Sequence, residues 1–198
     1  MRIEEQVHSL IRFGEKAFDG LSVLVNNASA PPSPGEALEN WVDSIQTDLL
    51  GTMYATRFAV DAMRRAGGGA IVNISSISAL WHGRKKPGGF PAYDAAKAGV
   101  IRLTTGLASL GEKDRIRVNC LAPGWIASDH VRSYWESLTP EQRVERGVPS
   151  KLLEPEEVAQ AVVRLATDES LCGRILVWWS EDPPRLISWA DPGYAALV

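Results

Sequence analysis

The chain has 198 residues, of which 45% are hydrophobic and 23% are charged, and it carries a formal net charge of −3 at pH 7. This length suits one domain with a buried core, and these proportions are ordinary for globular proteins. The composition argues against nucleic-acid binding, because the basic cluster at residues 84–86 is small, and against a membrane-spanning helix, because no run of about 18 apolar residues occurs.

The spacing of apolar residues predicts the elements of the amino-terminal part. Residues 3–18 have the pattern of an amphipathic helix, and the short apolar run 21–25 predicts a buried strand. The polar segment Asn26-Asn27-Ala28-Ser29 follows that strand. A helix is expected from about 36 to 65, with a break near Thr47-Asp48, and three consecutive glycines end it.

The middle and the carboxyl-terminal part of the chain are expected to continue the same pattern of strands and helices. Residues 70–74 predict a second buried strand, which leads into Ser75 and Ser76, and residues 77–89 read as a loop before a helix at 91–110. The remaining expected elements are a strand at 115–121, helix-prone residues at 129–147, a helix at 154–167, a strand at 174–179 and an irregular tail at 180–198.

Strands therefore alternate with helices along the whole chain. This alternation predicts an α/β fold in which a parallel sheet carries helices on both faces. No boundary or internal repeat divides the sequence, so residues 1–198 are expected to form a single domain.

The cysteines and the first residues set expectations about metal binding and compartment. Cys120 and Cys172 belong to no metal-ligand pattern, so no metal site is expected, and buried free thiols suit a reducing compartment. The first residues lack the apolar core of a signal peptide. The cytoplasm is therefore the expected location.

Tyr93 and Lys97 are the strongest candidates for chemistry. Four residues apart in a predicted helix, their side chains share one face. An ammonium near a phenol favours the phenolate, and this would lower the pKa of Tyr93 from about 10 toward the range of a general base. A tyrosine and a lysine at this spacing also occur on many helices by chance, so the pair gains weight only from the rest of the chain.

Four landmarks in order give that weight, namely Asn26-Asn27-Ala28-Ser29, Ser75-Ser76, Tyr93-x-x-x-Lys97 and Pro123-Gly124. Together they resemble the short-chain dehydrogenase/reductase family, which has a Rossmann fold and uses NAD or NADP. The resemblance covers roughly residues 1–180 and implies a three-layer, Rossmann-like sheet.

The resemblance also implies a role for each landmark. Ser76 would hydrogen-bond the substrate oxygen, with Ser75 and Ser78 as rivals. Tyr93 would donate and accept the proton, and Lys97 would lower the pKa of Tyr93 and hold the nicotinamide ribose. Further cofactor contacts are implied for Asn27, Ala28, Pro123, Gly124, Ile126 and Ser128.

Two residues depart from the family pattern. Ser29 stands where the family's NNAG segment has glycine, and Asp48 stands where the family often has a catalytic asparagine that supports a water-linked proton relay. An aspartate can still accept hydrogen bonds, but it adds a negative charge and lacks an amide donor. Asp48 is therefore kept among the catalytic candidates, with its relay function in question.

The family's opening strand and glycine-rich GxxxGxG turn do not occur in the sequence. That turn would bind the cofactor pyrophosphate at a helix amino terminus. We therefore expect a truncated or partial chain that lacks the first strands of the fold. The edge of the strand at 21–25 would then be uncovered and open to pairing.

The leading functional hypothesis is an NAD- or NADP-dependent oxidoreductase that acts on a small carbonyl or secondary alcohol. The alternative is a truncated or degenerate family member that serves as a non-catalytic binding or assembly subunit. Family analogy also implies a homo-oligomer built on the helices near 49–65 and 91–110. The loop at 81–90 and residues 129–150 are expected to shape the substrate pocket.

Overall fold

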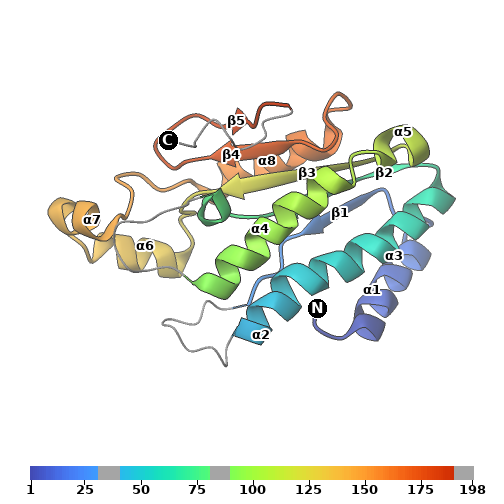
Figure 1. Ribbon diagram of the computed structural model, residues 1–198, viewed down its shortest axis with the longest axis horizontal. Coiled ribbons are helices and arrows are strands. Elements are labelled where there is room, and N and C mark those ends of the chain that lie inside the picture. The colour runs from blue at the N-terminus through green and yellow to red at the C-terminus, as the bar shows by residue number, and fades with distance from the viewer. Residues whose placement is uncertain (31–40, 81–89, 190–198) are drawn as a thin grey trace.

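The computed structural model describes residues 1–30, 41–80 and 90–189, and these residues form one five-stranded sheet in the order β1-β2-β3-β4-β5 (Figure 1). The strands are β1 (Val23–Asn26), β2 (Gly69–Ile74), β3 (Ile116–Pro123), β4 (Ile175–Trp178) and β5 (Arg185–Leu186). Neighbouring strands from β1 to β4 run parallel, and β5 runs antiparallel to β4. The expected α/β fold with a parallel sheet is confirmed.

Helices connect the strands, as expected. They are α1 (Glu4–Ala17), α2 (Trp41–Ser44), α3 (Gly51–Ala66), α4 (Pro91–Gly106), α5 (Leu110–Asp114), α6 (Asp129–Glu136), α7 (Pro140–Arg146) and α8 (Pro155–Thr167). A π-helical turn, η2 (Ile45–Leu50), joins α2 to α3, and a 3-10 turn, η3 (Ile77–Leu80), follows β2. The expected helix break near Thr47-Asp48 is therefore a wide π turn inside an otherwise continuous helix.

The helices cover both faces of the sheet (Figure 1). On one face α1 and α3 pack against Ile71 and Val118, and α4 packs against the β3 and β4 residues beside them. On the other face α8 packs against Val72 and Leu121. Successive residues of a strand point to opposite faces, so the buried strands supply apolar side chains to both layers.

The crossovers through α4 and α8 have opposite hands. Both move the chain in the same direction across the sheet, from β2 to β3 and from β3 to β4, yet α4 and α8 lie on opposite faces. Crossovers between parallel strands are right-handed in about 98% of cases, so one of these two is an exception. The residues between β3 and α8, which include α6 and α7, make this change of face.

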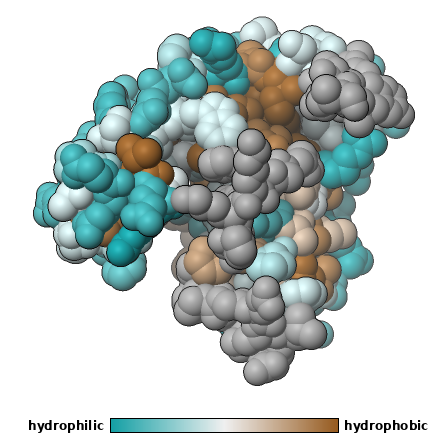
Figure 2. Space-filling model, turned by 60° about the vertical axis from the view of Figure 1, so that its left-hand side comes forward, coloured by the Kyte–Doolittle hydropathy of each residue, from teal (hydrophilic) through white to brown (hydrophobic). Residues whose placement is uncertain are grey.

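The α6–α7 lobe extends from the body of the protein and has a largely hydrophilic surface (Figures 1 and 2). Its inner side is fastened by Trp135, whose indole N–H donates to the Pro149 carbonyl at 2.8 Å. The Arg143 guanidinium stacks on the Trp135 ring at 3.4 Å. The expected helical character of 129–147 is confirmed.

Two expectations about the carboxyl-terminal half are wrong. The helix that begins at Pro91 ends at Gly106, and the separate helix α5 follows it. The tail from 180 is not wholly irregular, because β5 pairs with β4 through Leu186 and Leu176. Two expected features lie outside the described residues, namely the loop at 81–89 and the end of the tail at 190–198.

The described parts of the chain contain no helix with the length and apolar character needed to cross a membrane.

Candidate active site

A buried polar network lies at the carboxyl ends of β1 and β2. The Asn26 amide donates to the Asn73 side chain at 2.8 Å and to the Thr56 hydroxyl at 3.1 Å. The Asn73 amide donates in turn to the Thr104 hydroxyl at 3.0 Å. All four side chains are buried, so the network links β1, β2, α3 and α4 into one rigid edge. The candidate catalytic residues stand on this edge.

Tyr93 and Lys97 lie in the first turns of α4, which starts at Pro91 as expected for a proline at the first helical position. The Lys97 Nζ lies 5.4 Å from the centroid of the Tyr93 ring. Lys97 is only 3% exposed, and its Nζ donates to the Ile74 carbonyl at the end of β2 at 3.1 Å. The predicted shared face of the helix is therefore present.

The environment of Tyr93 differs from the expectation in one respect. Burial raises the pKa of Tyr93 above its ordinary value, a hydrogen bond from Ser76 acts to lower it, and the charges of Asp48 and Asp94 raise it further. The Lys97 ammonium lies over the ring and donates to a backbone carbonyl. The expected lowering of the pKa of Tyr93 is thus wrong for the structure as it stands, because loss of solvent outweighs the favourable contacts.

The pKa of Lys97 shifts in the opposite direction to that of Tyr93. Burial lowers the pKa of its ammonium, and the negative charge of Asp48 opposes this effect. The Cys120 thiolate would also oppose it, but burial raises the pKa of Cys120 to about 12, so this thiol is neutral near pH 7. Asp48 is therefore the charge that supports a protonated Lys97 within the described residues.

The three candidate serines have different neighbours. Ser76 hydrogen-bonds Tyr93, and its Oγ accepts a hydrogen bond from the Ser78 backbone N–H at 3.1 Å. Ser75 is buried and donates to the Lys97 carbonyl at 2.7 Å, so it fastens β2 to α4. The buried Ser78 hydroxyl has no hydrogen-bond partner among the described residues. Ser76 is thus the serine that the structure brings to Tyr93.

Asp48 is completely buried in η2 and has a well-defined setting. The Ala30 backbone N–H donates to its Oδ1 at 2.7 Å, and the Ser29 hydroxyl donates to its Oδ2 at 3.1 Å. Each carboxylate oxygen thus has a donor from the turn after β1. Because Asp48 also interacts electrostatically with Tyr93 and Lys97, it belongs to the same site. The sequence indicated Ser29 and Asp48 as departures but not their contact.

The segments expected to contact a cofactor lie at the same edge of the sheet. Asn27 and Ala28 are exposed just after β1. Pro123 ends β3, and the next residue, Gly124, donates from its backbone to the Trp178 carbonyl at 2.8 Å. A side chain at Gly124 would collide with Ser180, because a Cβ there would lie 2.5 Å from its Oγ.

The end of this segment leads into the α6–α7 lobe. Ile126 forms an isolated parallel bridge with Leu153. Ser128 is exposed and immediately precedes α6, with no hydrogen bond from its side chain to the helix end. The structure therefore gathers the expected residues at the carboxyl ends of β1, β2 and β3.

The sequence reasoning missed the roles of Asn73 and Thr104, and it did not connect Asn26 with them. A usable signal was present, because an asparagine inside an apolar strand must find partners when it is buried. Asn73 occupies such a position in β2, as Asn119 does in β3.

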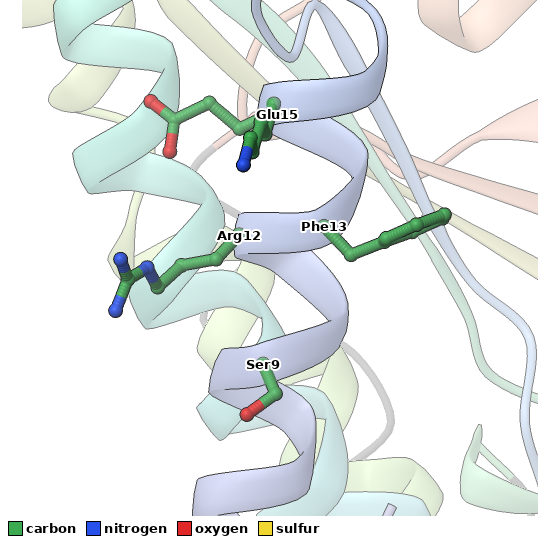
Figure 3. A pocket seen from close by; sticks show the side chains of 5 residues that line it. Ser9, Arg12, Phe13 and Glu15 are labelled. Atoms are coloured by element: carbon green, nitrogen blue, oxygen red, sulfur yellow. The ribbon is translucent and has the colours of Figure 1, made fainter.

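Two cavities lie away from Tyr93. One, of about 370 Å³, is a surface hollow lined by residues of α1 alone (Figure 3). Arg12 and Glu15 extend on one side of the helix and Phe13 on the other (Figure 3). The second, of about 930 Å³, opens at the amino ends of the strands near Ser22, Arg115 and other residues. Neither position fits the polar edge described above, so geometry and chemistry rather than cavity size identify the site.

No group of three or more His, Cys, Asp or Glu side chains suited to a metal gathers within residues 1–30, 41–80 and 90–189.

Comparison with known proteins identifies clear relatives. A family model described as enoyl-(acyl carrier protein) reductase matches residues 1–175. An acetoacetyl-CoA reductase from Rhizobium meliloti (strain 1021) is 39% identical over 153 residues, which cover 76% of this chain and 62% of the relative. The short chain dehydrogenase helC from Aspergillus fumigatus is 34% identical over 184 residues, which cover 86% of this chain and 69% of that protein.

Solved structures show the same fold. A structure of ElxO with a tyrosine-to-phenylalanine substitution and NADPH bound aligns with a TM-score of 0.78 at 31% identity, covering 89% of this chain and 73% of that one. A short-chain type dehydrogenase/reductase from Mycobacterium ulcerans aligns with a TM-score of 0.77 at 26% identity, covering 89% and 65%. The chain spans less than two thirds of the length of the first curated relatives that it matches.

Proposed function

We propose that this chain, which belongs to the short-chain dehydrogenase/reductase family, carries the proton-transfer site of an oxidoreductase that uses NAD or NADP and acts on a small carbonyl or secondary alcohol. One observation carries the proposal: Tyr93 meets the Ser76 hydroxyl and the buried Lys97 ammonium at one point of the sheet edge. The names of the relatives, which are reductases and dehydrogenases, support the same reaction class.

The residues of the site fit a nicotinamide cofactor. Lys97 has three N–H donors, and in the described part of the chain one of them is used, by the Ile74 carbonyl. The remaining donors suit ribose hydroxyls. Other parts of the cofactor would contact the exposed residues Asn27 and Ala28 and the segment from Pro123 to Ser128. When bound, the cofactor supplies or accepts the hydride.

The chain's own residues would then manage the proton. In carbonyl reduction, Ser76 would hold the substrate oxygen by a hydrogen bond and Tyr93 would give its phenolic proton to that oxygen. The raised pKa of Tyr93 keeps the phenol protonated near neutral pH, which suits this direction. Alcohol oxidation needs the ionised phenol, so its rate should increase with pH.

Asp48 is included in the catalytic set of the proposal. It cannot donate as an amide does, so it does not replace an asparagine in a relay that needs a donor. Its buried carboxylate instead offers a fixed negative charge close to Tyr93 and Lys97. We assign it an electrostatic function.

Substitution of Tyr93 by phenylalanine tests the proposal. Tyr93→Phe removes one hydroxyl and should lower turnover of NADPH or NADH with a panel of ketones and alcohols by a factor of about 10² to 10⁴. Circular dichroism should show an unchanged fold. Tyr54→Phe is the matched control, since it removes the same hydroxyl from a tyrosine of α3 that is outside the candidate set. Equal turnover in wild type and Tyr93→Phe would refute the assignment.

A second function is favoured by the exposed edge of the sheet. Val23 and Val25 are 46% and 42% exposed on the outermost parallel strand, and Phe13 and Phe18 of α1 are also exposed. Such an edge suits a truncated or degenerate family member that acts as a non-catalytic binding or assembly subunit. Titration of the 198-residue chain with NADH and NADPH, followed by nicotinamide fluorescence, separates the two functions. Tight binding supports the oxidoreductase, and absence of binding supports the assembly subunit.

The same proposal extends to assembly and location. Family analogy favours a homo-oligomer built on α3 and α4, which sedimentation can test. Free thiols at Cys120 and Cys172 favour a reducing compartment such as the cytoplasm. We also propose that residues 1–198 form one domain, and limited proteolysis that released a stable fragment would contradict this.

A further inference from the structure

The turn after β1 and the π turn η2 are joined by one polar contact that departs from the family pattern at both ends. Ser29 donates to Oδ2 of Asp48 at 3.1 Å, and Ala30 donates to Oδ1 at 2.7 Å. A carboxylate has only acceptors, so both of its oxygens need donors when it is buried. A glycine at position 29 would leave Oδ2 without this donor. The two residues that depart from the family pattern, Ser29 and Asp48, are therefore partners in one hydrogen bond.

The π turn explains how Asp48 reaches this position. In η2 the helix widens before α3 resumes at Gly51, and the widened turn directs residues that a regular α-helix would place elsewhere. The Thr52 hydroxyl donates to the Asp48 backbone carbonyl at 2.8 Å, which fastens the turn. Asp48 is thus held at its backbone by one element and at its carboxylate by another.

We propose that Asp48 sets the pH range of the proton-transfer site and that Ser29 is the positioning residue that keeps its carboxylate directed inward. This inference rests on the proposed function, and it deepens that function by assigning the two residues a joint task. The π turn η2, which carries Asp48, packs against α4, which carries Tyr93 and Lys97. The negative charge of Asp48 acts directly on Tyr93 to disfavour ionisation of its phenol, and it favours the protonated form of Lys97.

Other charged or titratable groups act on only one of the two residues. On α4 itself, Asp94 also disfavours ionisation of Tyr93, but the groups that act on Lys97 are Asp48 and Cys120. On β3, Cys120 is a neutral thiol near pH 7, and Arg117 donates to the carbonyls at the end of α8. On α2, which also packs against α4, the exposed Asp43 carboxylate pairs with Arg2 at 2.6 Å.

Two substitutions separate charge from position. Asp48→Asn keeps the size of the side chain and keeps an oxygen that can accept from Ala30, while it removes the charge and adds an amide donor. Ser29→Ala removes one of the two donors to the buried carboxylate, so Oδ2 of Asp48 is no longer held in place. Ser29→Thr retains a hydroxyl and serves as the conservative control.

The decisive measurement is a titration of Tyr93 by the ultraviolet absorbance of its phenolate, with the Tyr93→Phe spectrum subtracted. Asp48→Asn should lower the midpoint by about one pH unit. Ser29→Ala should lower it by less, and the double variant should shift no further than Asp48→Asn alone, because Ser29 acts only through Asp48. Ser29→Thr should behave as wild type.

The inference is overturned by an unchanged midpoint in Asp48→Asn, by fully additive shifts in the double variant, or by a Ser29→Thr midpoint that equals that of Ser29→Ala. If Asp48→Asn does not fold, the comparison of Ser29→Ala with Ser29→Thr decides alone. The titration needs no turnover, so it stands even if the oxidoreductase proposal fails. If turnover is measured, the pH profile of alcohol oxidation should move with the titration midpoint.

Discussion

Strands β1 and β3 come from similar apolar runs, but they occupy opposite environments. Every residue of β3 except Arg117 is buried, and the strand is paired on both sides. In β1 only Asn26 is buried, and one side of the strand has no partner among the described strands. An apolar run therefore identifies a strand but not its neighbours. The difference separates a central region that determines stability from an edge that is available for contacts.

The largest expected contrast concerns Asn119 of β3. Its amide donates to the carbonyls of Leu165 and Leu171, and its Oδ1 accepts from the Arg174 N–H. Asn119→Ala leaves these three groups without their partner and should lower the free energy of unfolding by about 4 kcal/mol. Urea denaturation measures this. Asn27→Ala, at an exposed position after β1, is the control and should cost less than about 0.5 kcal/mol.

The same valine-to-alanine change at the centre and at the edge gives the next contrast. Val118 is completely buried in β3, while Val25 of β1 is 42% exposed. Val118→Ala should lower the free energy of unfolding by about 3 kcal/mol through lost burial and a cavity. Val25→Ala should lower it by less than about 1 kcal/mol. If urea denaturation gave equal losses of unfolding free energy for the two variants, Val25 would be covered in solution, and the expected difference between centre and edge would be wrong.

The buried ammonium of Lys97 is expected to destabilise the fold, and Lys97→Met tests this. Replacing the buried ammonium by a thioether of similar length should raise the free energy of unfolding by about 1 kcal/mol near neutral pH. The pKa of Lys97 is lowered in the fold, so the unfolded chain binds more protons between that lowered pKa and the unfolded value of about 10.4. Wild-type stability therefore increases with pH through this window.

Thermal unfolding across that pH window tests the sign. The advantage of Lys97→Met should shrink as pH increases, because the wild-type amine becomes neutral and no longer opposes burial. An advantage that stays constant with pH would show that desolvation of the ammonium is not the cause.

The smallest effect on stability is expected for Val25→Lys at the edge. A charged side chain there should leave the fold intact, because the position faces solvent, and it should reduce self-association, because charges disfavour edge-to-edge pairing. Sedimentation velocity at increasing protein concentration measures the association. The control is Val144→Lys on α7, an exposed valine remote from the edge strand. If both variants associate like wild type, the edge is not the contact surface.

Much of the fold was accessible from the sequence, because hydrophobic period and length determine the type of an element. The strands and the main helices were predicted near their observed positions, and Tyr93, Lys97 and Ser76 lie together as the spacing and the resemblance implied. Their roles in catalysis remain predictions.

Features that depend on tertiary burial were not accessible. The direction of the pKa shift of Tyr93 is set by loss of solvent, which no local pattern reports. The contact between Ser29 and Asp48 joins residues 19 positions apart and depends on the π turn. The pairing of β5 with β4 joins short segments whose own sequence preference is weak.

The opposite hands of the two crossovers have a consequence for how this site can change. Because α8 lies on the face opposite α4, the chain must pass around the carboxyl edge of the sheet after β3, and the α6–α7 lobe is the part that makes this passage. The lobe contributes no strand to the sheet, so its length and surface can vary with little loss of stability. The lobe can therefore be exchanged in evolution while the strands and helices of the sheet stay in place.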